Sequence, residues 1–155
     1  MTAILYLFII ILLVCLDQYS KFLIIQNLNL GEKIVLIKDF FSLTHVNNYG
    51  AGFSILQNAT VFLSAVSILA IAILIYLLLH EKKLSYFSKT AYLLIISGAA
   101  GNLIDRLLKS YVTDFLDFLI FGYDFPVFNI ADCFITVGCF LLIGELLWES
   151  RSAAD

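Results

Sequence analysis

The sequence predicts an all-α membrane protein with four transmembrane helices and a small β-sheet platform outside the membrane. Of its 155 residues, 62% are hydrophobic, which is more than a soluble domain of this length tolerates. Four apolar runs reach the length of about 20 residues that a helix needs to cross the hydrocarbon core. They cover residues 4–25, 59–79, 90–108 and 130–147. Because the connections are short, we expect one integral membrane domain over residues 1–155.

The charges of the loops predict the orientation in the membrane. The loop 80–89 carries three Lys against one Glu, whereas residues 109–128 carry one Lys against three Asp. Lys and Arg favour the cytoplasmic side. We therefore expect both termini in the cytoplasm and residues 26–58 and 109–129 on the outer side.

The first apolar run, 4–25, contains an acid and a base. Asp17 and Lys21 are four residues apart, so they stack on one face of a helix as an ion pair. A charge inside the bilayer costs about 2.5–3.5 kcal/mol on insertion scales, so each such group needs a partner or a function. We interpret the pair as a latch that holds the first helix to its neighbours. We also expect this run to be kept as a helix and not cleaved as a signal.

The connection between the first two runs is rich in β-branched and aromatic residues and closes on Asn and Gly. This composition predicts short strands, with a turn at 47–52, that form a sheet at the level of the lipid headgroups. The second run, 59–79, contains no ionisable side chain, which indicates a lipid-facing support.

The third run combines small residues with polar ones near its outer end. Residues 97–101, Gly98 among them, are small and favour close helix packing. Asn102 and Asp105 share a helix face, whereas Arg106 points about 100° away, toward a substrate carbonyl or a loop carboxylate. The alternative is a buried hydrogen-bond network that only fixes the helix register. We favour a functional role, because such a network would not need a guanidinium as well.

The fourth run begins with a capping pattern. Asn129 is a good N-cap, and Asp132 stands at the third helical position, which the helix dipole favours for an acid. Capping alone accounts for Asp132. It does not account for the three Asp residues that the preceding loop gathers on the same outer side.

Two carboxylates held close together cannot both ionise easily, so they share one proton. Such a pair can deprotonate a water and protonate a peptide leaving group, which is the chemistry of aspartic proteases. The residues alone leave the members of the pair open among five candidates, namely Asp105, Asp114, Asp117, Asp124 and Asp132.

Two other functions are compatible with parts of the pattern. The outer Asp residues could hold magnesium in a metal-dependent lipid phosphotransferase, although the chain has no convincing nucleotide-phosphate motif. The charges of the first run could belong to a non-enzymatic transport subunit, although no inverted repeat is visible. The three Cys residues form no CxxC pair, and the two His residues fall on opposite sides of the membrane in this topology. We therefore expect no zinc or disulfide framework and predict buried thiols that act as small apolar residues.

Five short motifs, in this order, resemble those of the lipoprotein signal peptidases (signal peptidase II) across essentially the whole chain. They are DQYSK at 17–21, NYGAGFS at 48–54, GNLIDR at 101–106, VTDF at 112–115 and FNIAD at 128–132. Each motif alone is weak, but five in order on a four-helix frame are specific.

The resemblance implies an aspartic endopeptidase of the bacterial cytoplasmic membrane that needs no cofactor or metal. Such an enzyme removes the signal peptide from diacylglyceryl-modified prolipoproteins, cutting before the lipidated Cys at the outer face. The expected partners are these substrates and membrane lipids, not nucleic acid, and we expect a monomer.

The resemblance also implies roles for residues at the motif positions. It maps the catalytic dyad onto Asp114 and Asp132, and gives Asp17 and Lys21 a structural role. The other polar positions, which we expect to hold the substrate or orient the carboxylates, are Asn48, Asn102, Asp105, Arg106 and Asn129.

Overall fold

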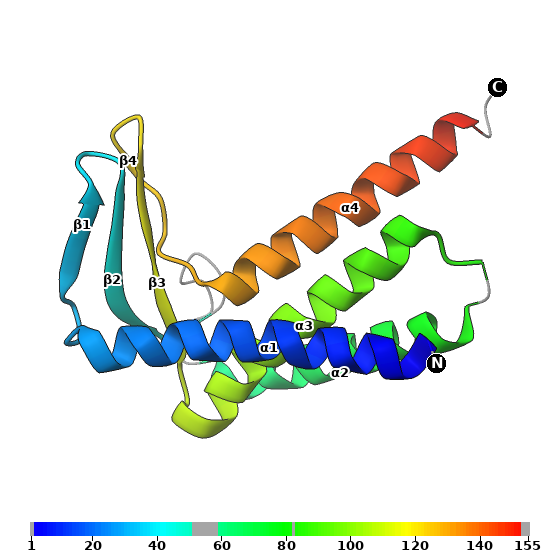
Figure 1. Ribbon diagram of the computed structural model, residues 1–155, viewed down its shortest axis with the longest axis horizontal. Coiled ribbons are helices and arrows are strands. Elements are labelled where there is room, and N and C mark those ends of the chain that lie inside the picture. The colour runs from blue at the N-terminus through cyan, green and yellow to red at the C-terminus, as the bar shows by residue number, and fades with distance from the viewer. Residues whose placement is uncertain (1, 51–58, 82, 153–155) are drawn as a thin grey trace.

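The computed structural model describes residues 2–50, 59–81 and 83–152. In this part of the chain, four helices are long and apolar enough to cross a membrane, which confirms the four predicted spans. The first and last helices have their free ends at the same end of the bundle, opposite the sheet (Figure 1). The helices are α1 (Thr2–Asn27), α2 (Thr60–His80), α3 (Tyr86–Lys109) and α4 (Ile130–Ser152).

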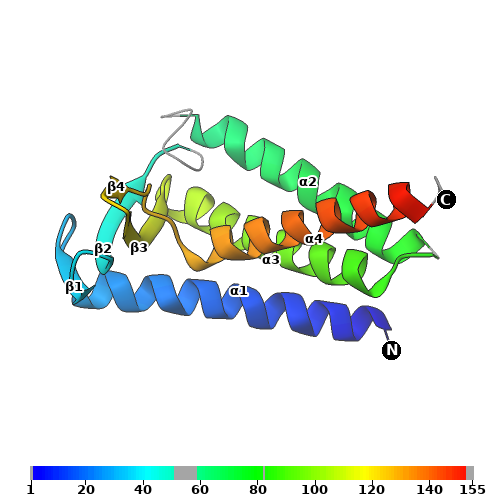
Figure 2. The same cartoon turned by 90° about the horizontal axis from the view of Figure 1, so that it is seen from above.

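Helix α3 is the central element of the bundle and packs against each of the other three. Half of its span is buried (50%), against 11% or less in the others, and it is also the least apolar span. Seen from above, α1 and α2 lie on opposite sides of α3 and α4 (Figure 2). The polar residues of the third run are therefore surrounded by protein, while the apolar surfaces of α1, α2 and α4 face lipid.

Small residues allow α3 to approach its neighbours closely. A Cβ atom at Gly98 would overlap the backbone carbonyl of Ala131 and the side chain of Ile135 in α4. A Cβ atom at Gly101 would overlap the carboxylate of Asp17 in α1. These contacts bring the polar groups of α1, α3 and α4 within hydrogen-bonding distance of one another.

A four-stranded antiparallel sheet in the order β1-β2-β3-β4 closes one end of the bundle. An apolar cluster of Ile24, Leu28 and Phe115 ties it to the end of α1. The strands are β1 (Lys33–Ile37), β2 (Phe41–Asn48), β3 (Val112–Ile120) and β4 (Tyr123–Asp124).

The sheet extends beyond the segment in which strands were predicted. Strands β1 and β2 come from the connection between the first two spans, as predicted, but β3 and β4 come from residues 109–129. A turn is predicted at 47–52, but Asn47 and Asn48 still belong to β2. Residues 51 and 52 lie outside the described residues.

The prediction of buried thiols is wrong for two of the three cysteines. Cys15 and Cys139 are exposed, and Cys133 is half-buried. Cys15 and Cys139 lie within membrane spans, where the surroundings are hydrocarbon. A small apolar thiol can therefore face lipid without being buried in the protein.

Candidate active site

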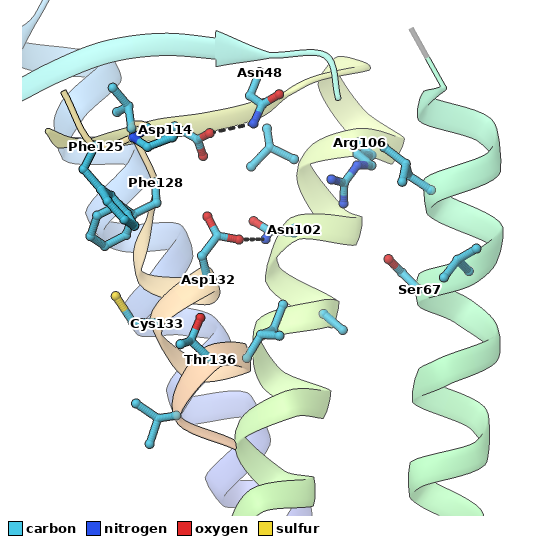
Figure 3. Close-up of a pocket in the computed structure, with 18 residues that line it drawn as sticks. Asn48, Ser67, Asn102, Arg106, Asp114, Phe125, Phe128, Asp132, Cys133 and Thr136 are labelled. Atoms are coloured by element: carbon cyan, nitrogen blue, oxygen red, sulfur yellow. Dashed lines mark hydrogen bonds between the residues drawn. The ribbon is translucent and has the colours of Figure 1, made fainter. Parts of the chain in front are cut away.

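Asp114 and Asp132 lie at one cavity, although they come from different elements. The cavity has a volume of about 680 Å³ and is lined by residues of α2, α3, α4 and β3. Asp114 projects from β3 and is only 2% exposed, whereas Asp132 projects from the first turn of α4 and is half-buried. Their carboxylates point toward the same space (Figure 3).

Both carboxylate oxygens of Asp114 accept a hydrogen bond from an asparagine. The Asn48 Nδ2 atom donates to Oδ2 at 2.8 Å, and the Asn129 Nδ2 atom donates to Oδ1 at 2.6 Å. Asn48 pairs with Val112 across the β2–β3 ladder, so Asp114 is its diagonal neighbour on the same face of the sheet. The register of two strands thus brings Asn48 to the carboxylate.

Asp132 is held by a reciprocal cap at the start of α4. The Asp132 backbone N–H donates to Asn129 Oδ1, and the Asn129 backbone N–H donates to Asp132 Oδ2, both at 3.1 Å. This is the arrangement that the capping pattern predicts. The other oxygen, Oδ1, accepts a hydrogen bond from Asn102 Nδ2 at 2.8 Å. Asn129 therefore contacts both carboxylates.

The environment of Asp114 favours its protonated form. Burial and the neighbouring charge of Asp132 raise the pKa of Asp114 to about 7, against the lowering effect of the hydrogen bonds from Asn48 and Asn129. A carboxyl group with a pKa near 7 can bind or release a proton close to neutral pH.

The structure places the other three candidate carboxylates elsewhere. Asp114 and Asp117 are three residues apart in one strand, so they lie on opposite faces of the sheet. The Asp117 Oδ2 atom lies 2.6 Å from Lys33 Nζ, at a second, smaller pocket that Asp124 also lines. Asp105 is fully buried, and it does not line the cavity.

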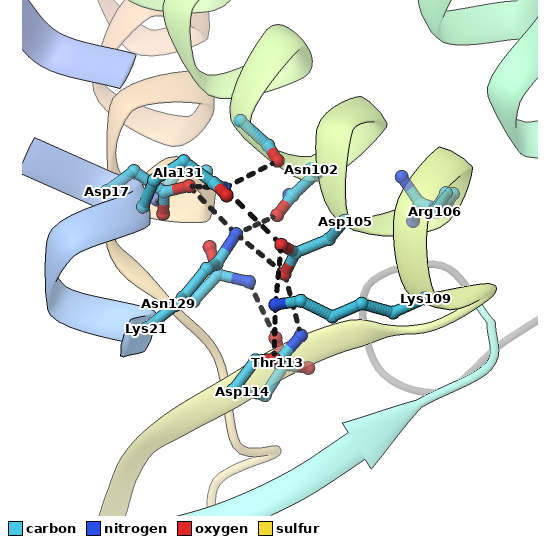
Figure 4. Close-up of polar contacts among 12 residues, drawn as sticks. Asp17, Lys21, Asn102, Asp105, Arg106, Lys109, Thr113, Asp114, Asn129 and Ala131 are labelled. Carbon is cyan, nitrogen blue, oxygen red and sulfur yellow. Dashed lines mark hydrogen bonds and ion pairs between the residues drawn. The ribbon is translucent and has the colours of Figure 1, made fainter. Parts of the chain in front are cut away.

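Asp105 belongs to a charged network with Asp17, Lys21 and Lys109 (Figure 4). The Lys21 Nζ atom lies 2.9 Å from Asp17 Oδ2 and 3.4 Å from Asp105 Oδ2, and it donates to Asn102 Oδ1 at 2.9 Å. The Lys109 Nζ atom lies 3.0 Å from Asp105 Oδ1. The predicted pair of Asp17 and Lys21 thus connects α1 to α3. The sequence patterns considered above predict no role for Lys109, although its spacing from Asp105 is also four residues.

The remaining cavity wall combines one guanidinium with apolar side chains. Arg106 lines the cavity and donates through Nη2 to the backbone carbonyl of Gly50 at 3.1 Å. It contacts a loop carbonyl, whereas the sequence predicts a substrate carbonyl or a loop carboxylate. Residues 51–54 of the second motif lie outside the described residues. Most of the wall is apolar, formed by residues such as Leu63, Val66, Ala99, Ile135 and Val137.

Comparison with known proteins relates the chain to membrane peptidases. A family model described as signal peptidase (SPase) II matches residues 9–148. A lipoprotein signal peptidase of Streptococcus pyogenes is 46% identical, with 94% of this chain and 93% of that protein covered. One of Fusobacterium nucleatum is 41% identical, with 94% and 88% covered.

Two solved structures of bacterial membrane enzymes share the fold. The first has a TM-score of 0.89 at 35% identity, with 95% of this chain and 90% of the other covered. The second has a TM-score of 0.82 at 37% identity, with 92% of each chain covered. The fold and the relatives assign the chain to the bacterial multi-pass membrane proteases. The chain belongs to the signal peptidase II family, whose members remove signal peptides from prolipoproteins.

Proposed function

We propose that this protease uses Asp114 and Asp132 as an aspartic dyad to cleave diacylglyceryl-modified prolipoproteins immediately before the lipidated Cys. The observation that carries the proposal is the convergence of two carboxylates on one cavity, each held by two hydrogen-bond donors. Fixed donors keep the carboxylates in place without neutralising them, which is what a general acid and a general base require.

In the proposed reaction the dyad holds one proton between its two carboxyl groups. The ionised carboxylate takes a proton from a water, whose oxygen attacks the scissile carbonyl carbon. The protonated carboxyl group gives its proton to the carbonyl oxygen, which produces a tetrahedral diol. The carboxyl group that took the proton of the water then gives it to the leaving amide nitrogen as the C–N bond breaks, while the other carboxylate takes a proton from a hydroxyl of the diol. The products are a carboxyl and an amine terminus, and the dyad again holds one proton.

The surrounding polar residues divide into two groups in this proposal. Asn102 and Asn129 orient the carboxylates to which they donate. Asn48 also donates to Asp114, so it belongs to both groups: with Arg106 it lies at the cavity wall and holds the substrate backbone. Arg106 exchanges the Gly50 carbonyl for a substrate carbonyl. For Asp105, which lies behind the cavity, we propose an indirect role through its neighbours.

The shape of the cavity suits a substrate that arrives from lipid. Its apolar wall is formed by α2 and α4 as well as α3, and its polar end lies at the sheet end of the spans. A signal helix would lie in the bilayer while its end reaches the dyad. We place this end on the outer side of the cytoplasmic membrane and both termini inside, because the lysine-rich loop 80–89 lies at the opposite end.

The direct test is cleavage of a purified, lipidated prolipoprotein by the purified, monomeric protein in excess EDTA. Mass spectrometry should find the new amino terminus at the lipidated Cys. The same precursor without its diacylglyceryl group serves as the specificity control and should be cut far more slowly. Failure to cut in EDTA, with recovery on addition of magnesium, would favour metal-dependent chemistry and contradict the aspartic mechanism.

The pH dependence should show the loss of the shared proton. Because the pKa of Asp114 is raised to about 7, the dyad loses its last proton as the pH rises through that value. We expect kcat/KM to fall above about pH 7, since the fully ionised pair has no acid for the carbonyl oxygen. Initial rates measured between pH 5 and 9, at pH values where the melting temperature is constant, check this prediction. A rate that stays flat to pH 9 would contradict the assignment.

A further inference from the structure

Lys21 is connected to both carboxylates of the dyad through side chains that contact its ammonium group. Its ammonium group has only donors, so the Asn102 oxygen must face Lys21. The Asn102 NH2 group must then face Asp132, where its Nδ2 atom lies 2.8 Å from Oδ1. The orientation of the amide that holds Asp132 is therefore set by a lysine in another helix.

The two acidic partners of Lys21 each hold a backbone amide next to one dyad residue. Asp17 Oδ1 accepts a hydrogen bond at 3.0 Å from the N–H of Ala131, the residue before Asp132. Asp105 Oδ2 accepts one at 3.0 Å from the N–H of Thr113, the residue before Asp114. One buried cation thus anchors two carboxylates, and each carboxylate fixes the chain that carries one member of the dyad.

We propose that Lys21 is a positioning residue. Through Asp17, Asn102 and Asp105 it fixes the orientation of the two dyad carboxylates and helps them to hold one shared proton. This inference rests on the proposed function. It goes beyond a latch between helices, because a latch would hold α1 in place without affecting the chemistry of the pair.

The charges around Lys21 support an effect on the proton as well as on the geometry. Asp17 on α1 and Asp105 on α3 contact its ammonium group directly, and Lys109 lies on the far side of Asp105. The dyad itself faces Lys21 from α4 and β3. The charge of Lys21 lowers the pKa of Asp114, against the larger effects of burial and of Asp132. Removal of that charge should therefore move the alkaline limb of the pH profile, which reports Asp114, to higher pH.

The test uses a charge-balanced double variant, Asp17→Asn with Lys21→Met. Removing one partner of a buried ion pair leaves an uncompensated charge, whereas removing both charges is often tolerated. The amide oxygen that Asp17→Asn introduces can still accept a hydrogen bond from the Ala131 N–H. We expect a folded enzyme whose kcat falls on the order of 100-fold, as for a displacement of about 1 Å. Its KM should change little, and the alkaline limb of its pH profile should move to higher pH.

Lys109→Met provides a control for the loss of one cation from the same cluster, because Lys21 remains 3.4 Å from Asp105. Lys109 pairs with the same carboxylate of Asp105 and contacts Thr113, but its charge is not among those that shift Asp114. We expect its pH profile to coincide with that of the wild type. A double variant with wild-type kcat and pH profile would overturn the inference and leave the proposed function intact. A wild type that does not cleave would instead overturn the proposed function.

Asn102→Ser tests the same connection without removing a charge from the ion cluster. It removes the amide between Lys21 and Asp132 while Lys21 keeps both acidic partners. We expect a lower kcat at unchanged KM, with the alkaline limb of the pH profile kept in place because the lysine charge that acts on Asp114 remains. A wild-type kcat in this variant would overturn the inference even if the double variant did not fold.

Discussion

Asp132→Asn should reduce kcat for cleavage of a lipidated prolipoprotein by about 10²–10⁴-fold, and Asp114→Asn should do the same. Either change leaves one carboxyl group, which cannot hold the shared proton and the negative charge at once. The amide is nearly the same size as the carboxylate, so the shape of the cavity is kept. The measurement is single-turnover cleavage in excess EDTA, with thermal unfolding of each variant recorded in the same detergent.

Asp117→Asn is the matched control for this result. It lies in the same strand as Asp114, but on the opposite face, where it pairs with Lys33. The exposed fraction of the Lys33 side chain is 49%, and ion pairs of this kind contribute little to stability. We expect its activity and melting temperature to stay near those of the wild type. Near-normal turnover in a folded Asp114→Asn or Asp132→Asn variant would show that the reaction does not use this pair.

The helical part of the fold was predictable because its cause is local. Each span contains its own hydropathy signal, and the four helices in the structure match the four predicted runs. The sheet was predictable only in part. The segment VTDFLDFLI forms β3 because it pairs with β2, and that partner lies more than sixty residues earlier in the chain. Its register also brings Asn48 to Asp114, a contact that no local pattern indicates.

Within the candidate site, two further features follow from the spacing of residues in the sequence. Had residues 112–120 been recognised as a strand, their two-residue period would have placed Asp117 on the opposite face from Asp114. The spacing of Asp105 and Lys109 matches that of Asp17 and Lys21, and it indicates a second ion pair. The link from Lys21 through Asn102 to Asp132 crosses three helices, so it depends on how the helices pack and could not be derived from spacing.

Gly98→Ala should destabilise the protein and separate the two helices that carry the site. A Cβ atom at this position overlaps the Ala131 backbone carbonyl, which cannot move without shifting the start of α4. Overpacking of this kind costs about 1–3 kcal/mol, which exceeds the gain of about 1 kcal/mol expected when alanine replaces glycine in a helix. Because Ala131 directly precedes Asp132, the same shift should stretch the Asn102–Asp132 hydrogen bond of 2.8 Å and lower kcat.

Gly144→Ala isolates the packing effect from the helix-propensity effect. Gly144 also lies within a membrane-spanning helix, α4, but nothing in the described residues lies within 4 Å of a Cβ atom built there. The propensity gain should be the same as at Gly98, and no packing cost should oppose it, so we expect an equal or higher melting temperature and wild-type cleavage. Thermal unfolding of both alanine variants in one detergent gives the comparison. If Gly98→Ala melted as high as Gly144→Ala and cleaved at the wild-type rate, close contact between α3 and α4 at Gly98 would not be what holds Asp132 in place.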